Sequence, residues 1–178
     1  SGMLSQGTKF GDINTVYRYS ELHLTPQRPA FLVHRLDKAA QGLQIIAHSK
    51  RAAQLFSKLF ETRGLNKIYH AKVQAATKPD NTQTIATDID GKPAISHWQL
   101  LDFDSKTKKA LLEVSIETGS KHQIRKHLSA AGFAIEGDRL YGQGPFTGNL
   151  QLLAWRLAFV CPLTGASRHY QAPIDITL

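Results

Sequence analysis

The chain has one cysteine, Cys161, among its 178 residues. A single cysteine can form neither an intramolecular disulfide framework nor a cysteine-based metal cluster. Apolar runs are also short, since none approaches the roughly 18 residues that a membrane-spanning helix needs. These absences favour a reduced, cytoplasmic protein without a membrane anchor, and they exclude a disulfide-stabilised scaffold.

Motifs for metals and nucleotides are missing as well. The sequence has no His-x-x-x-His pair, because His122 and His127 are five residues apart, and it has no glycine-rich phosphate loop. A Gly-x-Ser-x-Gly nucleophile elbow is also absent. We therefore expect no metal ligand and no cofactor.

Positive charge and apolar residues are what the chain does contain. Hydrophobic residues make up 42%, which suits one compact domain over 1–178, and the formal net charge is +8. A basic balance favours a polyanionic partner such as RNA, since Lys and Arg neutralise phosphates and release counterions. Charge alone is equally compatible with a basic surface that binds nothing.

Periodicity predicts an α+β fold in which strands mostly follow one another directly. Residues 1–30 look irregular, whereas 49–64 and 120–132 are typical of amphipathic helices capped by Ser49 and Ser120. Gln123 stands at the capping-box spacing from Ser120. The expected strands cover 43–47, 67–75, 84–89, 94–103, 110–118, 149–162 and 169–174. This order favours a mixed, mostly antiparallel sheet flanked by helices.

Three clusters carry candidate chemistry. "FLVHRLDKAAQGL" places His34, Arg35 and Asp37 among apolar residues, where charges are rare unless paired or used. "KIYHAKV" begins with Lys67 and places Tyr69 on a strand. "TGSKHQIRKHL" brings its cations to a helix start, which is suited to binding anions; they are Lys121, His122, Arg125 and Lys126. Singly, each cluster has an ordinary structural explanation.

Together, the clusters resemble a known family. "HRLDKAAQGL", "KIYHAKV", "ETGSKHQIRKHLSAAGFAIEGDRLYG" and "LQLLAWRLAFVCPLTG…HYQAP" are similar, in order and spacing, to the signature blocks of the RluA family of RNA pseudouridine synthases. The resemblance covers nearly the whole chain from about residue 30. It implies a pseudouridine-synthase fold, cofactor-free isomerisation of uridine in rRNA or tRNA, and a monomer.

The same resemblance assigns roles to particular residues. It implies that Asp37 is the catalytic aspartate, that Tyr69 is the family's tyrosine and that Arg125 is its basic partner. Arg35 corresponds to the arginine that replaces the flipped base. From the residue chemistry, we expect Arg125 to keep Asp37 ionised, because a close cation favours the charged form. Further RNA- or substrate-binding candidates are His34, Lys67, Lys121, His122 and Ile124.

The sequence departs from the family pattern in three places. Ala40-Gln41 replaces the usual Thr-Ser, and Ser120 replaces an arginine whose contact Lys121 would partly supply. The strand and Lys-Pro-x-Gly segment that normally open the domain are not evident, so we expect a chain that lacks the N-terminal part of the family domain.

Two other functions remain open at this point. One is an RNA-binding module that keeps the fold without catalysis. The other is acid–base cleavage of RNA by His34 or His122, which fits the histidines but not the pattern of blocks.

Overall fold

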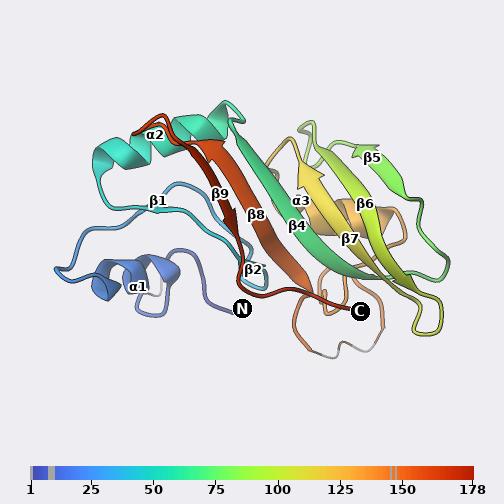
Figure 1. Ribbon diagram of the computed structural model, residues 1–178. Coiled ribbons are helices and arrows are strands. Elements are labelled where there is room, and N and C mark those ends of the chain that lie inside the picture. Colours follow the sequence, from blue (N-terminus) through green and yellow to red (C-terminus); the bar gives the residue numbers. More distant parts are fainter. Residues whose placement is uncertain (1, 8–10, 145, 147) are drawn as a thin grey trace.

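One large sheet organises the molecule in the computed structural model, which describes residues 2–7, 11–144, 146 and 148–178 (Figure 1). The strands of this part are β1 (Phe31–Leu32), β2 (Gln41–Gly42), β3 (Ile46–Ala47), β4 (Leu65–Gln74), β5 (Thr82–Ala86), β6 (Ile95–Asp104), β7 (Lys109–Ile116), β8 (Leu152–Val160) and β9 (Ser167–Gln171). Its helices are α1 (Val16–His23), α2 (Lys50–Glu61) and α3 (Gln123–Ala130).

The sheet has the strand order β2-β8-β4-β7-β6-β5, and β9 pairs with β8. The β2–β8 pair is parallel and the other pairs are antiparallel. β1 and β3 form a separate two-stranded antiparallel sheet. The predicted α+β class with a mixed, mostly antiparallel sheet is therefore confirmed.

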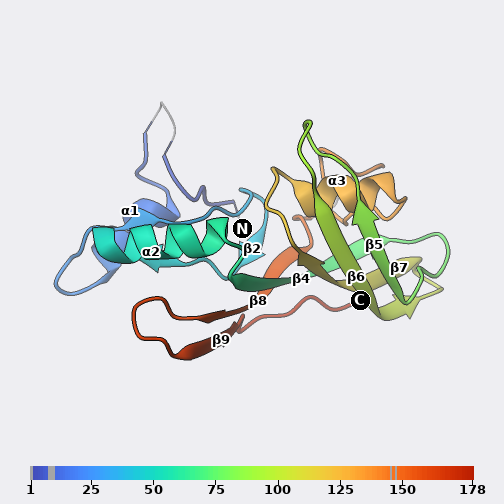
Figure 2. The same cartoon turned by 90° about the horizontal axis from the view of Figure 1, so that it is seen from above.

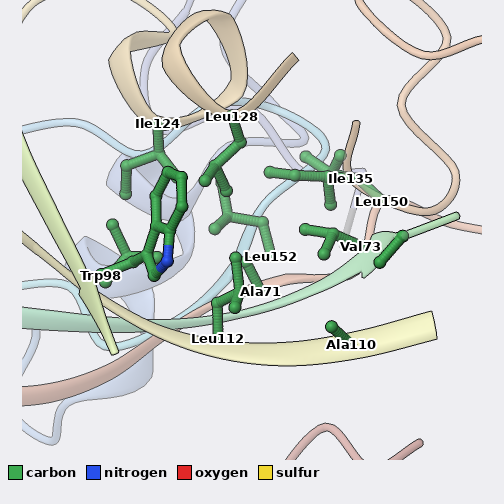
Figure 3. Packing of buried hydrophobic residues seen from close by; sticks show 12 residues of the cluster. Ala71, Val73, Trp98, Ala110, Leu112, Ile124, Leu128, Ile135, Leu150 and Leu152 are labelled. Carbon is green, nitrogen blue, oxygen red and sulfur yellow. The ribbon is translucent and has the colours of Figure 1, made fainter. Parts of the chain in front are cut away.

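The main core lies between α3 and one face of the sheet. Figure 3 shows Ile124 and Leu128 of α3 above Trp98, Ala71 and Leu112, which come from three strands. Ala71 and Leu112 are fully buried, as the alternation in the sequence predicts for one strand face. This packing fixes α3, and with it the start of that helix, against β4, β6 and β7.

The opposite face carries a second, smaller cluster. Leu153, the neighbour of the core residue Leu152, points to this side and packs with Ala172 and Ile176 of the C-terminal segment. Trp155 joins the same cluster. Figure 2 shows α2 and α3 at different ends of the molecule.

Most predicted elements are confirmed, including α2, whose first turn is capped by Ser49 accepting a hydrogen bond from the Ala52 N–H at 3.1 Å. The irregular start predicted for 1–30 is wrong in part. The hydroxyl of Thr15 accepts a bond from the Arg18 N–H at 3.1 Å, and this cap starts α1 despite the surrounding glycines and prolines.

The single strand predicted over 43–47 is also wrong. Gln41 pairs with Leu153 in β2, whereas Ile46 pairs with Leu32 in the other sheet. Between them the Ile45 N–H donates to the ring of His34 rather than to a neighbouring strand. The chain thus changes sheets here, and Gln41, which departs from the family pattern, takes part in the parallel pair.

Candidate active site

Asp37 lies in the loop between β1 and β2, and the N-terminal segment holds this loop in place. The buried hydroxyl of Ser5 accepts a hydrogen bond from the Leu36 N–H at 3.3 Å and donates one to the Leu36 carbonyl at 3.2 Å. The Ala40 N–H donates to the Asp37 carbonyl at 3.0 Å. With the backbone fixed on both sides, the Asp37 side chain remains 24% exposed in a cavity wall.

Arg125, in the first turn of α3, binds two carboxylates at once. Its Nε and Nη2 donate to Asp138 at 2.8 and 2.7 Å, and its Nη1 donates to Oδ2 of Asp37 at 3.3 Å. The Arg125 and Asp138 side chains are almost fully buried. A bidentate, charge-assisted pair of this kind fixes the plane of the guanidinium, so Nη1 is aimed at Asp37.

Both members of the buried pair are charged. Burial by itself raises the pKa of the Asp138 carboxyl, but hydrogen bonds from Arg125 and from the Leu140 and Tyr141 amides lower this pKa below its ordinary value. The hydrogen bond to Asp138 is the main reason why the pKa of Arg125 is raised. Arg125 is therefore a permanent cation beside Asp37, although most of its charge is already paired.

Asp138 was not singled out from the sequence. It stands in "GDRLYG", which the pattern identifies only as a glycine-punctuated loop. A Cβ at Gly137 would lie 2.3 Å from the Asn149 carbonyl oxygen, and Gly137 also has φ +76°. Only glycine fits this close backbone approach. The turn at Gly137 places the next residue, Asp138, where its carboxylate binds the guanidinium of Arg125.

His122 supplies a second partner for Asp37. Its backbone is left-handed, at φ 56°, which is uncommon for a residue other than glycine. Nε2 of His122 lies 3.7 Å from Oδ1 of Asp37, and Nδ1 lies 2.9 Å from the Tyr141 hydroxyl. Burial lowers the pKa of His122, with the charge of Asp37 opposing this shift and Arg125 adding to it.

The start of α3 differs from the predicted cap. The Ser120 hydroxyl does not cap the helix, but the Ser120 N–H donates to Oε1 of Gln123 at 3.0 Å, so the Gln123 half of the predicted capping box is present. Gln123 is buried and also bonds Thr118 and Ser96, and Ser96 bonds His127 at 2.9 Å. This network replaces the helix cap and anchors the turn that carries His122 and Arg125.

Tyr69 stands on β4, which runs between β7 and β8. Burial, together with the negative charge of Asp37, raises the pKa of Tyr69 to about 12. Its hydroxyl is therefore protonated at neutral pH and can donate a proton or a hydrogen bond. The ring borders both the cavity and the main core.

His34 and Lys67 form another part of the cavity wall. Nε2 of His34 accepts a hydrogen bond from the Ile45 N–H at 2.8 Å, and its ring stacks on Phe60 at 4.5 Å. Burial, aided by the charge of Lys67, lowers the pKa of His34 to about 4. Burial also lowers the pKa of Lys67, whose Nζ lies 5.8 Å from the centre of the Phe60 ring.

All nine candidate residues line one open cavity of about 1710 Å³. They come from segments spread between residues 34 and 125, and Arg35 and Lys121 stand exposed at its edge. The wall is basic, with seven Lys or Arg side chains against three carboxylates. The cations are Arg35, Lys38, Arg63, Lys67, Lys92, Lys121 and Arg125, and the acids are Asp37, Glu61 and Glu117.

The described residues offer neither a cluster of metal ligands nor a membrane-spanning helix. Within 2–7, 11–144, 146 and 148–178, there is no group of three or more His, Cys, Asp or Glu side chains that could hold a metal ion. In the same part of the chain, no helix is long and apolar enough to cross a membrane.

Comparison with known proteins gives a consistent result. Residues 1–130 match the family model described as RNA pseudouridylate synthase. The chain is 34% identical, over 180 residues, to a protein of Chloroflexus aurantiacus named as an uncharacterized RNA pseudouridine synthase, covering 90% of this chain and 55% of that one.

Two further relatives have more specific names. The chain is 30% identical to the dual-specificity RNA pseudouridine synthase RluA of Vibrio parahaemolyticus, covering 81% of this chain and 66% of the relative. It is also 30% identical to the ribosomal large subunit pseudouridine synthase D of Neisseria meningitidis, covering 82% and 45%. The chain thus spans between about half and two thirds of the length of these relatives.

Solved structures share the fold. Human RNA pseudouridylate synthase domain containing 1 superposes with a TM-score of 0.76 at 21% identity, covering 90% of this chain and 74% of that one. Human RNA pseudouridylate synthase domain containing 4 gives 0.74 at 23% identity, covering 97% and 82%.

Proposed function

We propose, since this chain belongs to the RNA pseudouridylate synthase family, that it isomerises uridine to pseudouridine in RNA. In this reaction the N1–C1′ bond breaks and a C5–C1′ bond forms, while C5 loses a proton and N1 gains one. No electron is exchanged and no water is consumed. The observation that carries the proposal is the position of Asp37, which lies in a basic cavity between Arg125 and His122. Its negative charge also raises the pKa of Tyr69, another residue of the cavity wall.

Asp37 is the catalytic group of this proposal. Its carboxylate can attack C1′ as a nucleophile, stabilise the cation-like sugar while the glycosidic bond breaks, or remove a sugar proton on a glycal route. All three routes need an ionised, oriented carboxylate. Arg125 donates to one carboxylate oxygen and His122 lies 3.7 Å from the other, and these two neighbours supply that orientation.

Tyr69 and Arg35 act on the base. The uridine leaves its stack to reach Asp37, and this costs a few kcal/mol. Tyr69 offers a flat ring to the extruded uracil and a protonated hydroxyl for the exchange between C5 and N1. Arg35 is exposed at the cavity edge, where its planar guanidinium can stack in the vacated place.

The remaining candidates form the pocket and its rim. Ile124 is buried and gives the pocket an apolar wall, and Lys67 and Lys121 add positive charge for the backbone phosphates. His34 contributes a stacked, neutral ring, because its Nε2 lone pair is already used by the Ile45 N–H. That bond weakens the case for acid–base cleavage by His34.

The substrate is a structured rRNA or tRNA. Two relatives are named for the large ribosomal subunit and for dual RNA specificity, and the cation excess of the cavity suits a phosphate backbone.

A tritium-release assay tests the proposal. Transcripts of rRNA and tRNA carrying [5-³H]uridine are incubated with the protein, and the RNA is then digested to identify pseudouridine. We expect release by the wild type and none by Asp37→Asn, with RNA binding largely retained by the variant. Turnover by Asp37→Asn would refute the role of the carboxylate, bound but unchanged RNA would indicate a binding module, and cleaved RNA would indicate a nuclease.

A further inference from the structure

Tyr141 contacts both side chains that hold Asp37, yet it is not among the described residues that line the cavity. Its hydroxyl lies 2.9 Å from Nδ1 of His122, and the guanidinium carbon of Arg125 lies 5.1 Å from the centre of its ring. His122 and Arg125 reach different oxygens of Asp37, at 3.7 and 3.3 Å. One side chain outside the cavity therefore meets both carboxylate partners.

Tyr141 is itself fixed relative to α3. Its N–H donates to Oδ1 of Asp138 at 3.1 Å, and its carbonyl accepts a bond from the Ser129 hydroxyl at 2.6 Å. Ser129 belongs to α3, and Asp138 is bound to Arg125 of the same helix. The backbone of Tyr141 is thus tied to α3 on both sides, and its side chain contacts His122 and Arg125 from this fixed position.

The tautomer of His122 sets the direction of its hydrogen bond with Tyr141, and the same tautomer decides what Nε2 presents to Asp37 at 3.7 Å, which is outside hydrogen-bond distance. The carboxylate of Asp37 only accepts, so a neutral His122 ring meets it best with its single N–H on Nε2. Nδ1 then carries a lone pair, and the Tyr141 hydroxyl is placed to donate to it. In this arrangement Tyr141 donates to Nδ1, and the Nε2–H of His122 faces Oδ1 of Asp37 at 3.7 Å.

The surroundings of His122 favour the neutral ring that this order requires. Burial lowers its pKa most, and the positive charges of Arg125, Lys121 and Lys126 lower it further. The negative charge of Asp37 acts in the opposite direction. At neutral pH the ring therefore carries one proton, and its partners decide which nitrogen holds it.

We propose that Tyr141 is a positioning residue of this site, which holds His122 in the Nε2–H tautomer so that His122 and Arg125 together orient the two oxygens of Asp37. The effect on rate rests on the proposed isomerase function, whereas the tautomer is a property of the folded protein alone. A misoriented carboxylate costs rate rather than affinity, because reacting atoms must be aligned and not merely close.

Tyr141→Phe isolates the hydroxyl, because it keeps the ring beneath Arg125. His122→Gln removes the imidazole, and Tyr19→Phe is the matched control, on an exposed tyrosine of α1. Long-range ¹H–¹⁵N spectra of the histidine rings report the tautomer of His122 without RNA. Tritium release gives kcat and KM, and thermal melting confirms that each variant is folded.

We expect the Nε2–H tautomer of His122 in the wild type and its loss in Tyr141→Phe. We expect kcat of Tyr141→Phe to fall about three- to tenfold, the range for one neutral hydrogen bond, with KM little changed. In the double variant Tyr141→Phe/His122→Gln, the rate should equal that of His122→Gln, because the hydroxyl then has no ring to hold.

Several outcomes would overturn the proposal. They are an Nδ1–H tautomer in the wild type, an unchanged kcat or an unchanged tautomer in Tyr141→Phe, and additive losses in the double variant. If the wild type isomerises no RNA, the proposed function fails, and the spectra still decide whether Tyr141 sets the tautomer.

Discussion

Arg125 is held more closely by Asp138 than by Asp37, with donor–acceptor distances of 2.8 and 2.7 Å to the former and 3.3 Å to the latter. Asp138 neutralises most of the guanidinium charge and fixes its plane. Asp37 then receives a directed but weaker contact. A carboxylate that must react is better served by such a partner than by a fully committed ion pair.

Asp138→Asn is expected to destabilise the fold and to slow isomerisation. Removing one member of a buried ion pair leaves the other without compensation, which costs about 3 kcal/mol or more. Since the pKa of Asp138 is lowered by folding, this contribution is present above the unfolded value near 4 and is lost as the pH falls below it. Urea unfolding at pH 7 and pH 3 measures the loss of stability and its pH dependence, tritium release measures the rate, and Asp90→Asn, in an exposed pair with Lys126, is the control.

Replacing Tyr69 by Phe separates the ring from the hydroxyl. If the protonated hydroxyl serves the exchange between C5 and N1, kcat should fall about 100-fold, the scale of general acid–base catalysis, while KM stays near its wild-type value. Tritium release and product analysis measure this change. Normal product formation by Tyr69→Phe would exclude a role for the hydroxyl and leave only the ring of Tyr69 with a function.

His34→Gln is expected to make the free energy of unfolding depend less on pH between pH 6.5 and pH 4. Folding lowers the pKa of His34 from 6.5 to about 4, so the neutral ring favours the folded state above pH 6.5. That contribution, up to about 3 kcal/mol, is lost as the pH falls from 6.5 towards 4. Unfolding free energies at pH 7 and pH 5 give the difference, and an equal acid slope in the variant would contradict this account.

Ser5→Ala tests whether the N-terminal segment holds the catalytic loop. The variant leaves the N–H and carbonyl of Leu36 without their partner, which costs about 1–2 kcal/mol of stability. A mobile Asp37 should also lower kcat more than it raises KM. Denaturant unfolding and tritium release are the measurements, and Ser105→Ala in the exposed turn after β6 is the control. A wild-type kcat in Ser5→Ala would show that the hydrogen bonds between Ser5 and Leu36 are not needed for catalysis.

Arg35→Lys keeps the charge but loses the planar guanidinium. Stacking on a base is worth about 1–3 kcal/mol, so kcat/KM on folded RNA should drop about tenfold. A short single-stranded uridine oligomer should suffer less, because its bases are less firmly stacked. Competition between the two RNAs measures the ratio, with Arg51→Lys on the exposed face of α2 as control. Equal losses on both would rule out a role in replacing the flipped base.

The sequence by itself determined most strands of the large sheet, the long helix α2 and, through the family resemblance, the set of nine candidate residues. Strand alternation follows burial along the chain, so the sequence predicted that Ala71 and Leu112 lie on buried strand faces. The order of four blocks identified the family, and residues named from those blocks meet in one cavity.

Only the tertiary structure decided how these residues are held. Ser5 reaches Leu36 across 31 positions, and Asp138 binds Arg125 from the loop that follows α3. Tyr141 meets His122 through a loop whose sequence signals no more than a turn. No periodicity encodes such partners, because a hydrogen bond depends on distance and angle in space, and these are set when α3 and the two loops pack against the same sheet.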